Sequence, residues 1–126
     1  MTAAARSERS AFVAGALAMV CVASPAFAQA RFIKATPAAG SNVGSATEVR
    51  LEFSERVDPR FSGLTLAAPN HVNVELGEPE IESGDPRVLV VPISNVLEPG
   101  PYTVYWDVVS FDDHRIQGKF NFDVKP

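Results

Sequence analysis

Alternation of apolar and polar residues with a period of two is the feature that most constrains this chain. Val49, Leu51 and Phe53 alternate with charged or hydroxyl-bearing residues, and the pattern recurs at 72–76 and 120–124. Successive side chains of an extended strand point to opposite faces, so each segment predicts a strand with one buried face. No window shows the sustained apolar stripe of an amphipathic helix. The pattern therefore predicts an all-β fold.

Further strand candidates are separated by clusters of turn residues. β-Branched and aromatic residues are dense at 88–91 and 102–109, and weaker strands are expected at 32–35 and 64–67. Pro, Gly, Asn and Asp gather between these segments, as is typical of turns. About seven strands in roughly 100 residues predict an immunoglobulin-like antiparallel β-sandwich. Trp106, between alternating valines, is expected at the centre of its core.

Residues 1–28 are predicted to be a secretory signal peptide that is cleaved off. A basic start precedes an uncharged apolar run at 11–23, and an A-x-A triplet follows at 26–28. This combination is typical of a signal peptide, and the run is too short to span a bilayer. Cleavage directly after the triplet leaves a mature sandwich domain at 29–126. Cleavage after Ala30 is the alternative.

The mature chain is expected to contain no sulfur. Removal of residues 1–28 from the 126-residue chain leaves 98 residues and takes away Met1, Met19 and Cys21. A disulfide, a thiol nucleophile, a Cys-ligated zinc and a Cys/Met site for Cu(I) are then excluded. The 11 basic and 15 acidic residues become 9 and 14. This acidic balance argues against a nucleic-acid or anionic-membrane binder.

Few residues could carry chemistry, and His114 stands out among them. His71 is expected to be a solvent-exposed strand histidine. His114 and Asp112, two residues apart, project to the same side if the chain is extended. A carboxylate beside an imidazole is a pair of ligands suited to Cu(II), Ni(II) or Zn(II).

Ser110 lacks the orienting partner and oxyanion hole that a nucleophilic serine needs. Glutamates at 78–82 are interpreted as a solvated acidic sheet edge.

Nine short landmarks run through residues 31–124 in a fixed order: 36–41 (TPAAGS), 49–55 (VRLEFSE), 61–63 (FSG), 90–92 (VVP), 97–100 (LEPG), 102–106 (YTVYW), 108–110 (VVS), 112–114 (DDH) and 118–122 (GKFNF). Taken together they resemble the CopC-like periplasmic copper-binding and copper-resistance proteins. The resemblance implies an immunoglobulin-like β-sandwich in the periplasm. It also implies one copper site at most, and exchange of Cu(II) with an inner-membrane copper transporter.

The resemblance also implies which residues would hold the metal. Family members that bind Cu(II) tightly use a mature N-terminal histidine together with an Asp-x-His before the last strand. Asp112 and His114 match the Asp-x-His, whereas Gln29 stands where the histidine is expected. Glutamine offers an α-amine and a weak amide oxygen, and cyclisation to pyroglutamate would remove the amine. The expected metal set is Asp112, His114 and Gln29, with Asp113 as a further oxygen and Arg115 as an unfavourable neighbouring charge.

The residues and the resemblance lead to two candidate functions. The first is sequestration or delivery of Cu(II) in copper homeostasis, through a site weakened by the loss of the N-terminal histidine. The alternative is a metal-free immunoglobulin-like interaction module that has kept the fold and lost the site, and it is motivated by Gln29. The absence of the N-terminal histidine also removes the two-histidine brace that copper oxygenases need, so no enzyme activity is expected.

Overall fold

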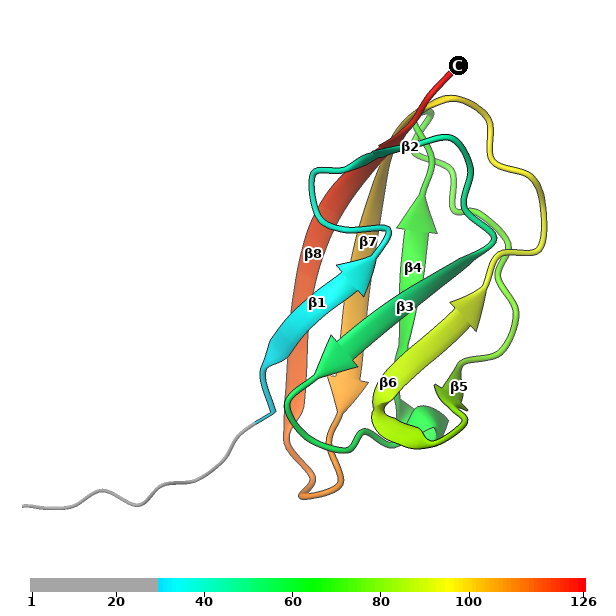
Figure 1. Ribbon diagram of the computed structural model, residues 1–126. Helices are drawn as coiled ribbons and strands as arrows, with labels where there is room; N and C mark the ends of the chain where they lie inside the picture. Colours follow the sequence, from blue (N-terminus) through cyan, green and yellow to red (C-terminus); the bar gives the residue numbers. More distant parts are fainter. Residues whose placement is uncertain (1–29) are drawn as a thin grey trace, which may run out of the picture.

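Two four-stranded sheets pack face to face in the computed structural model, which describes residues 30–126 (Figure 1). The strand order is β1-β3-β6-β5 in the first sheet and β2-β8-β7-β4 in the second. The strands are β1 (Phe32–Thr36), β2 (Asn42–Val43), β3 (Glu48–Phe53), β4 (Gly63–Ala67), β5 (Glu80–Glu82), β6 (Asp85–Pro92), β7 (Gly100–Val109) and β8 (Arg115–Val124), and a short 3₁₀ helix, η2 (Pro59–Phe61), follows β3. The predicted all-β sandwich without a disulfide is confirmed. The predicted signal peptide and Gln29 lie outside the described residues.

Alternating burial along the strands makes the core. In β3 the side chains of Val49, Leu51 and Phe53 are fully buried, while the residues between them are partly exposed. In β8 Phe120 and Phe122 are buried in the same way, as the period of two predicted. The apolar faces of the two sheets therefore point toward each other and exclude water. Burial of this apolar surface is the main contribution to the stability of a domain without crosslinks.

A cluster of four aromatic rings closes the core near the start of β1. Trp106 is stacked on Phe32 with ring centroids 5.4 Å apart, and it meets Phe53 edge-on at the same distance. Phe120 stacks on Phe32 at 5.9 Å. Such offset and edge-to-face pairs add to the free energy gained by burial. Trp106 is a core residue, as predicted, and it joins β1 and β3 to the opposite sheet.

The start of β1 and the β7–β8 turn lie at the same end of the sandwich (Figure 1). Arg31 and Ser54 exchange two hydrogen bonds, of 2.8 and 2.9 Å, which fix the chain just before β1 against the end of β3. Two residues further on, the carbonyl of Arg56 accepts a hydrogen bond from the Phe111 N–H at 3.1 Å. The segment after β3 therefore connects the start of the domain to the β7–β8 turn.

The strand predicted at 72–76 is wrong. This segment makes only isolated bridges, between Ala67 and Asn73 and between Leu76 and Ile93. A turn precedes it, in which His71 has a φ of 68° and the Asn70 side chain accepts a hydrogen bond from the Val72 N–H. That turn sends the chain back along β4 for a single bridge, so no regular ladder develops. His71 is exposed, as expected, but it lies in a turn.

The short strand β2 was not predicted, and β5 lies within the segment that was interpreted as an acidic sheet edge. β2 pairs in parallel with the end of β8, the one parallel pair between residues 30 and 126. β5 is the edge of the first sheet and carries two of the glutamates interpreted as an acidic edge. One of them, Glu82, forms an ion pair with Arg50 of β3.

Among the described residues, no helix has the length and apolar character needed to cross a membrane.

Gly118 is predicted to be required for the packing of Trp106. The two residues are cross-strand partners, and a Cβ at Gly118 would lie 2.7 Å from the Cε2 of the indole. We expect Gly118→Ala to lower the free energy of unfolding by about 1–3 kcal/mol, the usual cost of overpacking. Gly44→Ala is the control, because a Cβ there meets no atom within 4 Å. Urea unfolding of both variants measures the difference; equal stabilities would contradict the proposed contact.

Candidate metal site

The turn between β7 and β8 is closed by backbone hydrogen bonds across residues 110–114. The Ser110 N–H donates to the carbonyl of His114 at 2.9 Å, and the Asp113 N–H donates to the carbonyl of Ser110 at 3.0 Å. Asp113 occupies the left-handed region with a φ of 69°. Aspartate tolerates this conformation better than most residues because its short side chain can bond locally. The turn therefore holds Asp112 and His114 on either side of one strained residue.

Asp112 and His114 converge across a turn, and not along the extended chain on which the expectation from their spacing depended. The Nδ1 of His114 lies 3.1 Å from the Oδ2 of Asp112, and the two side chains are 46% and 49% exposed. Two ligand atoms at right angles, each about 2.0 Å from a metal, are about 2.8 Å apart. The observed separation thus fits two adjacent ligands of one ion with little rearrangement. The pair also lies at the surface, where an ion can reach it directly.

Ser110 positions the carboxylate of Asp112 from beneath. Its side chain is almost fully buried, and its hydroxyl donates a hydrogen bond to Asp112 Oδ1. That bond leaves Oδ2 directed toward the imidazole of His114. The Ser110 hydroxyl, followed by the hydrogen bond to His114, lowers the pKa of Asp112 below its ordinary value. Asp112 therefore stays ionised, as a metal ligand must be, to a lower pH than a free aspartate.

The remaining expected ligands do not complete the site. Gln29 lies outside the part of the chain that the structure describes. Asp113 is not grouped with the pair, since residues 30–126 contain no cluster of three or more His, Cys, Asp or Glu side chains able to hold a metal ion. Arg115 is directed to the β7 side chain of Asp107, with its guanidinium nitrogen 2.5 Å from the carboxylate. Its charge is therefore compensated by Asp107.

A surface hollow of about 320 Å³ adjoins Asp112, and His114 is not among the residues that line it. It is lined by Glu55 and Arg56 after β3 and by Ser110, Phe111 and Asp112 of the turn. The guanidinium carbon of Arg56 lies 4.5 Å above the centroid of the Phe111 ring. Within residues 30–126 Arg56 makes no ion pair and no side-chain hydrogen bond. The hollow thus places a cation beside the candidate site.

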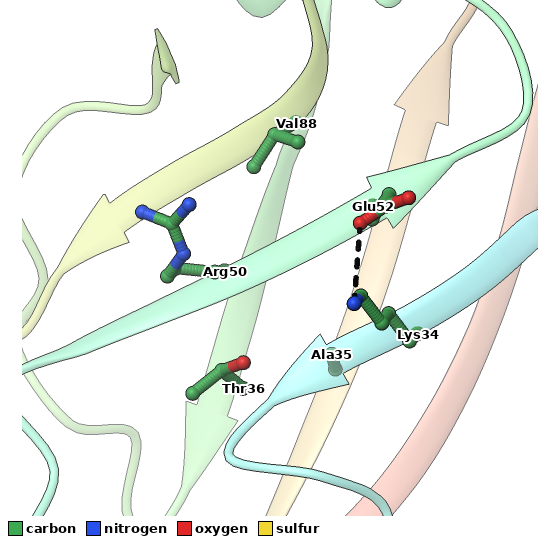
Figure 2. Close-up of a pocket in the computed structure, with 6 residues that line it drawn as sticks. All are labelled: Lys34, Ala35, Thr36, Arg50, Glu52 and Val88. Atoms are coloured by element: carbon green, nitrogen blue, oxygen red, sulfur yellow. Dashed lines mark ion pairs between the residues drawn. The ribbon is translucent and has the colours of Figure 1, made fainter. Parts of the chain in front are cut away.

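A second hollow, of about 160 Å³, lies on the outer face of the first sheet (Figure 2). Its two cationic side chains are already paired. Lys34 lies 3.8 Å from Glu52, and Arg50 forms ion pairs with Glu48 and Glu82. No imidazole lines this hollow. It therefore lacks the donor set of a metal site and the free charge of an anion site.

Sequence reasoning missed the structural role of Ser110. The residue was considered only as a nucleophile, because nothing local shows that it is buried. Its burial follows from an isolated bridge between Ser110 and Val57, which are more than fifty residues apart. A polar residue at the end of a strong strand, two residues before Asp112, was the available signal. It could not reveal the tertiary contact.

We expect Ser110→Ala to raise the pKa of Asp112 toward its ordinary value, because the alanine cannot donate to the carboxylate. A depressed folded-state pKa stabilises the protein above the unfolded pKa, near pH 4, and this contribution is lost as the pH falls through the folded pKa. The loss of melting temperature in Ser110→Ala should therefore be present at pH 7 and shrink on acidification below about pH 4.

NMR titration of the Asp112 carboxyl carbon measures this pKa directly. Ser62→Ala is the matched control: Ser62 is also buried, and its hydroxyl accepts the Val109 N–H at 2.9 Å without contacting Asp112. An Asp112 pKa that is the same in wild type and Ser110→Ala would remove the positioning role of the hydroxyl.

Comparison with known proteins gives a consistent result over the whole described domain. A family model for the CopC domain matches residues 32–125. The chain is 36% identical to Protein YobA of Escherichia coli strain K12, over 99% of this chain and 100% of that protein. It is 32% identical to Copper resistance protein C of Pseudomonas syringae pv. tomato, over 94% and 98%. The crystal structure of CopC from Methylosinus trichosporium OB3b matches with a TM-score of 0.71 at 27% identity, over 78% of this chain and 95% of that one. The chain belongs to the CopC family.

Proposed function

We propose that this protein binds Cu(II) and sequesters or delivers it in copper homeostasis or resistance. Membership of the CopC family supports a function in copper binding or resistance, since relatives include proteins named for copper resistance. The observation that carries the proposal in this chain is the convergence of Asp112 and His114, with Oδ2 and Nδ1 3.1 Å apart. We further propose that the protein works in the periplasm and exchanges copper with an inner-membrane copper transporter.

The donor atoms match the preference of Cu(II). This ion favours nitrogen and oxygen ligands in a square-planar arrangement. Asp112 supplies a carboxylate oxygen that Ser110 keeps ionised, and His114 supplies an imidazole nitrogen. The proposed third ligand is the α-amine of Gln29. Gln29 directly precedes Ala30, which is buried at this end of the sandwich. Water fills the fourth position, so the affinity is lower than that of a site with two imidazoles.

The ligand pair also determines how pH affects binding. A metal binds the neutral imidazole, so protons compete with copper for His114. Protons compete less with copper for the carboxylate of Asp112, because the pKa of Asp112 is lowered. Asp112 therefore remains an ionised ligand to a lower pH than a free aspartate would. Delivery to an acceptor is favoured by the exposure of both side chains, which lets a second ligand set approach the ion.

The proposed export determines whether Gln29 can act as a ligand. We predict that mass spectrometry of the protein purified after export shows Gln29 as the first residue, following cleavage after Ala28. A mass about 17 Da below that of residues 29–126 shows loss of ammonia and therefore pyroglutamate, which leaves no α-amine for the metal. A chain that starts at Arg31, after cleavage at Ala30, would exclude Gln29 as a ligand altogether.

The copper site is tested by titrating the processed protein with Cu(II). We expect one ion per chain, with an EPR spectrum of nitrogen and oxygen ligands. His114→Ala should lower the affinity by roughly tenfold or more, since it removes the imidazole. His71→Ala is the matched control, because His71 is an exposed histidine in a turn apart from the pair. Equal affinity of wild type and His114→Ala would exclude the proposed site.

A metal-free interaction module is the second candidate function. It is favoured by the finding that residues 30–126 bring together only two metal-binding side chains. A ligand that binds only the folded state stabilises it, by about 2.7 kcal/mol at 100 times the Kd. An unchanged melting temperature in the presence of excess Cu(II), together with a featureless titration, would support the module and exclude the copper function.

A further inference from the structure

We propose that the copper ion is bound together with a free α-amino acid, whose carboxylate is held by Arg56 in the hollow beside Asp112. This inference rests on the proposed copper function and names the group that completes the coordination. Asp112 and His114 supply two donors, and the described residues group no third His, Cys, Asp or Glu with them. Cu(II) favours four donors in a plane. An amino acid that binds through its amine and one carboxylate oxygen supplies two, which replace water and the α-amine of Gln29.

Arg56 is positioned to recognise the second carboxylate oxygen of such a ligand. Its carbonyl accepts the Phe111 N–H at 3.1 Å, which fixes its backbone beside the residue that precedes Asp112. Its guanidinium lies over the Phe111 ring at 4.5 Å. Stacking occupies the face of the guanidinium and leaves the N–H groups at its edge free to donate. Between residues 30 and 126 no carboxylate is paired with it, in contrast to Arg60, Arg87 and Arg115.

The other walls of the hollow limit which ligand fits. The volume of about 320 Å³ accommodates a small amino acid, and Phe111, which is 54% exposed, offers an apolar surface to its side chain. Glu55 also lines the hollow, and its negative charge opposes a second carboxylate on the ligand. The hollow therefore favours a ligand with one carboxylate, such as alanine, over a di- or tricarboxylate such as citrate.

The probe for this inference is ¹⁵N-labelled L-alanine. We expect equilibrium dialysis of the copper-loaded protein to retain one alanine per copper ion, and the copper-free protein to retain none. The EPR spectrum should show the nuclear coupling of the label, which places the amine on the metal. Alanine that removes copper from the protein without being retained would overturn the inference. An EPR spectrum without coupling to ¹⁵N would overturn it as well.

Arg56→Gln tests the role of the guanidinium. We expect it to weaken retention of alanine by roughly tenfold, in line with the loss of a hydrogen bond to a charged group, without weakening the binding of copper alone. Arg56→Lys should retain alanine more weakly than wild type and more tightly than Arg56→Gln, because lysine keeps the charge and loses the forked geometry. Arg87→Gln is the matched control, since Arg87 is paired with Asp85 outside the hollow. Equal retention by wild type and Arg56→Gln would refute the assignment of Arg56.

The two proposals fail in different ways. A protein that binds no copper in amino-acid-free buffer contradicts the proposed copper function, and the co-ligand is excluded with it. A protein that binds copper alone through His114 but does not retain alanine keeps the copper function and loses only this inference. Citrate retained as tightly as alanine would contradict the role given to Glu55.

Discussion

The register of the β7–β8 ladder determines where the candidate ligands lie. Ten consecutive residue pairs join the strands, from Gly100 opposite Val124 to Val109 opposite Arg115. The ladder leaves five residues for the turn, and the Ser110–His114 hydrogen bond closes it. A shift by one residue would turn every core side chain of β8 outward. The pairing that buries Phe120 and Phe122 therefore also sets the length of the turn that carries Asp112 and His114.

The aromatic cluster connects this ladder to the other sheet. Phe32 packs on Trp106 and Phe120 of the second sheet, and its strand pairs with β3. Because Phe32 lies two residues after the first described residue, this packing holds the start of the domain at the end that carries the turn. Core packing thus places the start of the domain at the end of the sandwich that carries the β7–β8 turn (Figure 1). Any site that used groups from both would depend on the packed aromatic core.

Most of the sandwich could be predicted from periodicity, because alternate burial in strands such as β3 leaves a direct trace in the sequence. Strands that depend on distant partners could not. β2 has two residues and exists only through its pairing with β8, and the alternation at 72–76 is interrupted by the turn at His71. The spacing of Asp112 and His114 indicated a common side only for an extended chain, whereas the pair converges across a turn in which Asp113 has a positive φ. The support from Ser110 and the nearby guanidinium of Arg56 depend on contacts with the segment after β3, which no local pattern encodes.

The hydrogen bonds between Arg31 and Ser54 have a practical consequence for work with this protein. They hold Arg31, near the first described residue, at the end of the sandwich that carries the β7–β8 turn, whereas the carboxyl terminus leaves from the opposite end (Figure 1). A polyhistidine tag at the amino terminus would bring its own imidazoles next to the candidate site and would itself collect copper. Purification handles and fluorophores therefore belong at the carboxyl terminus, a full strand length away.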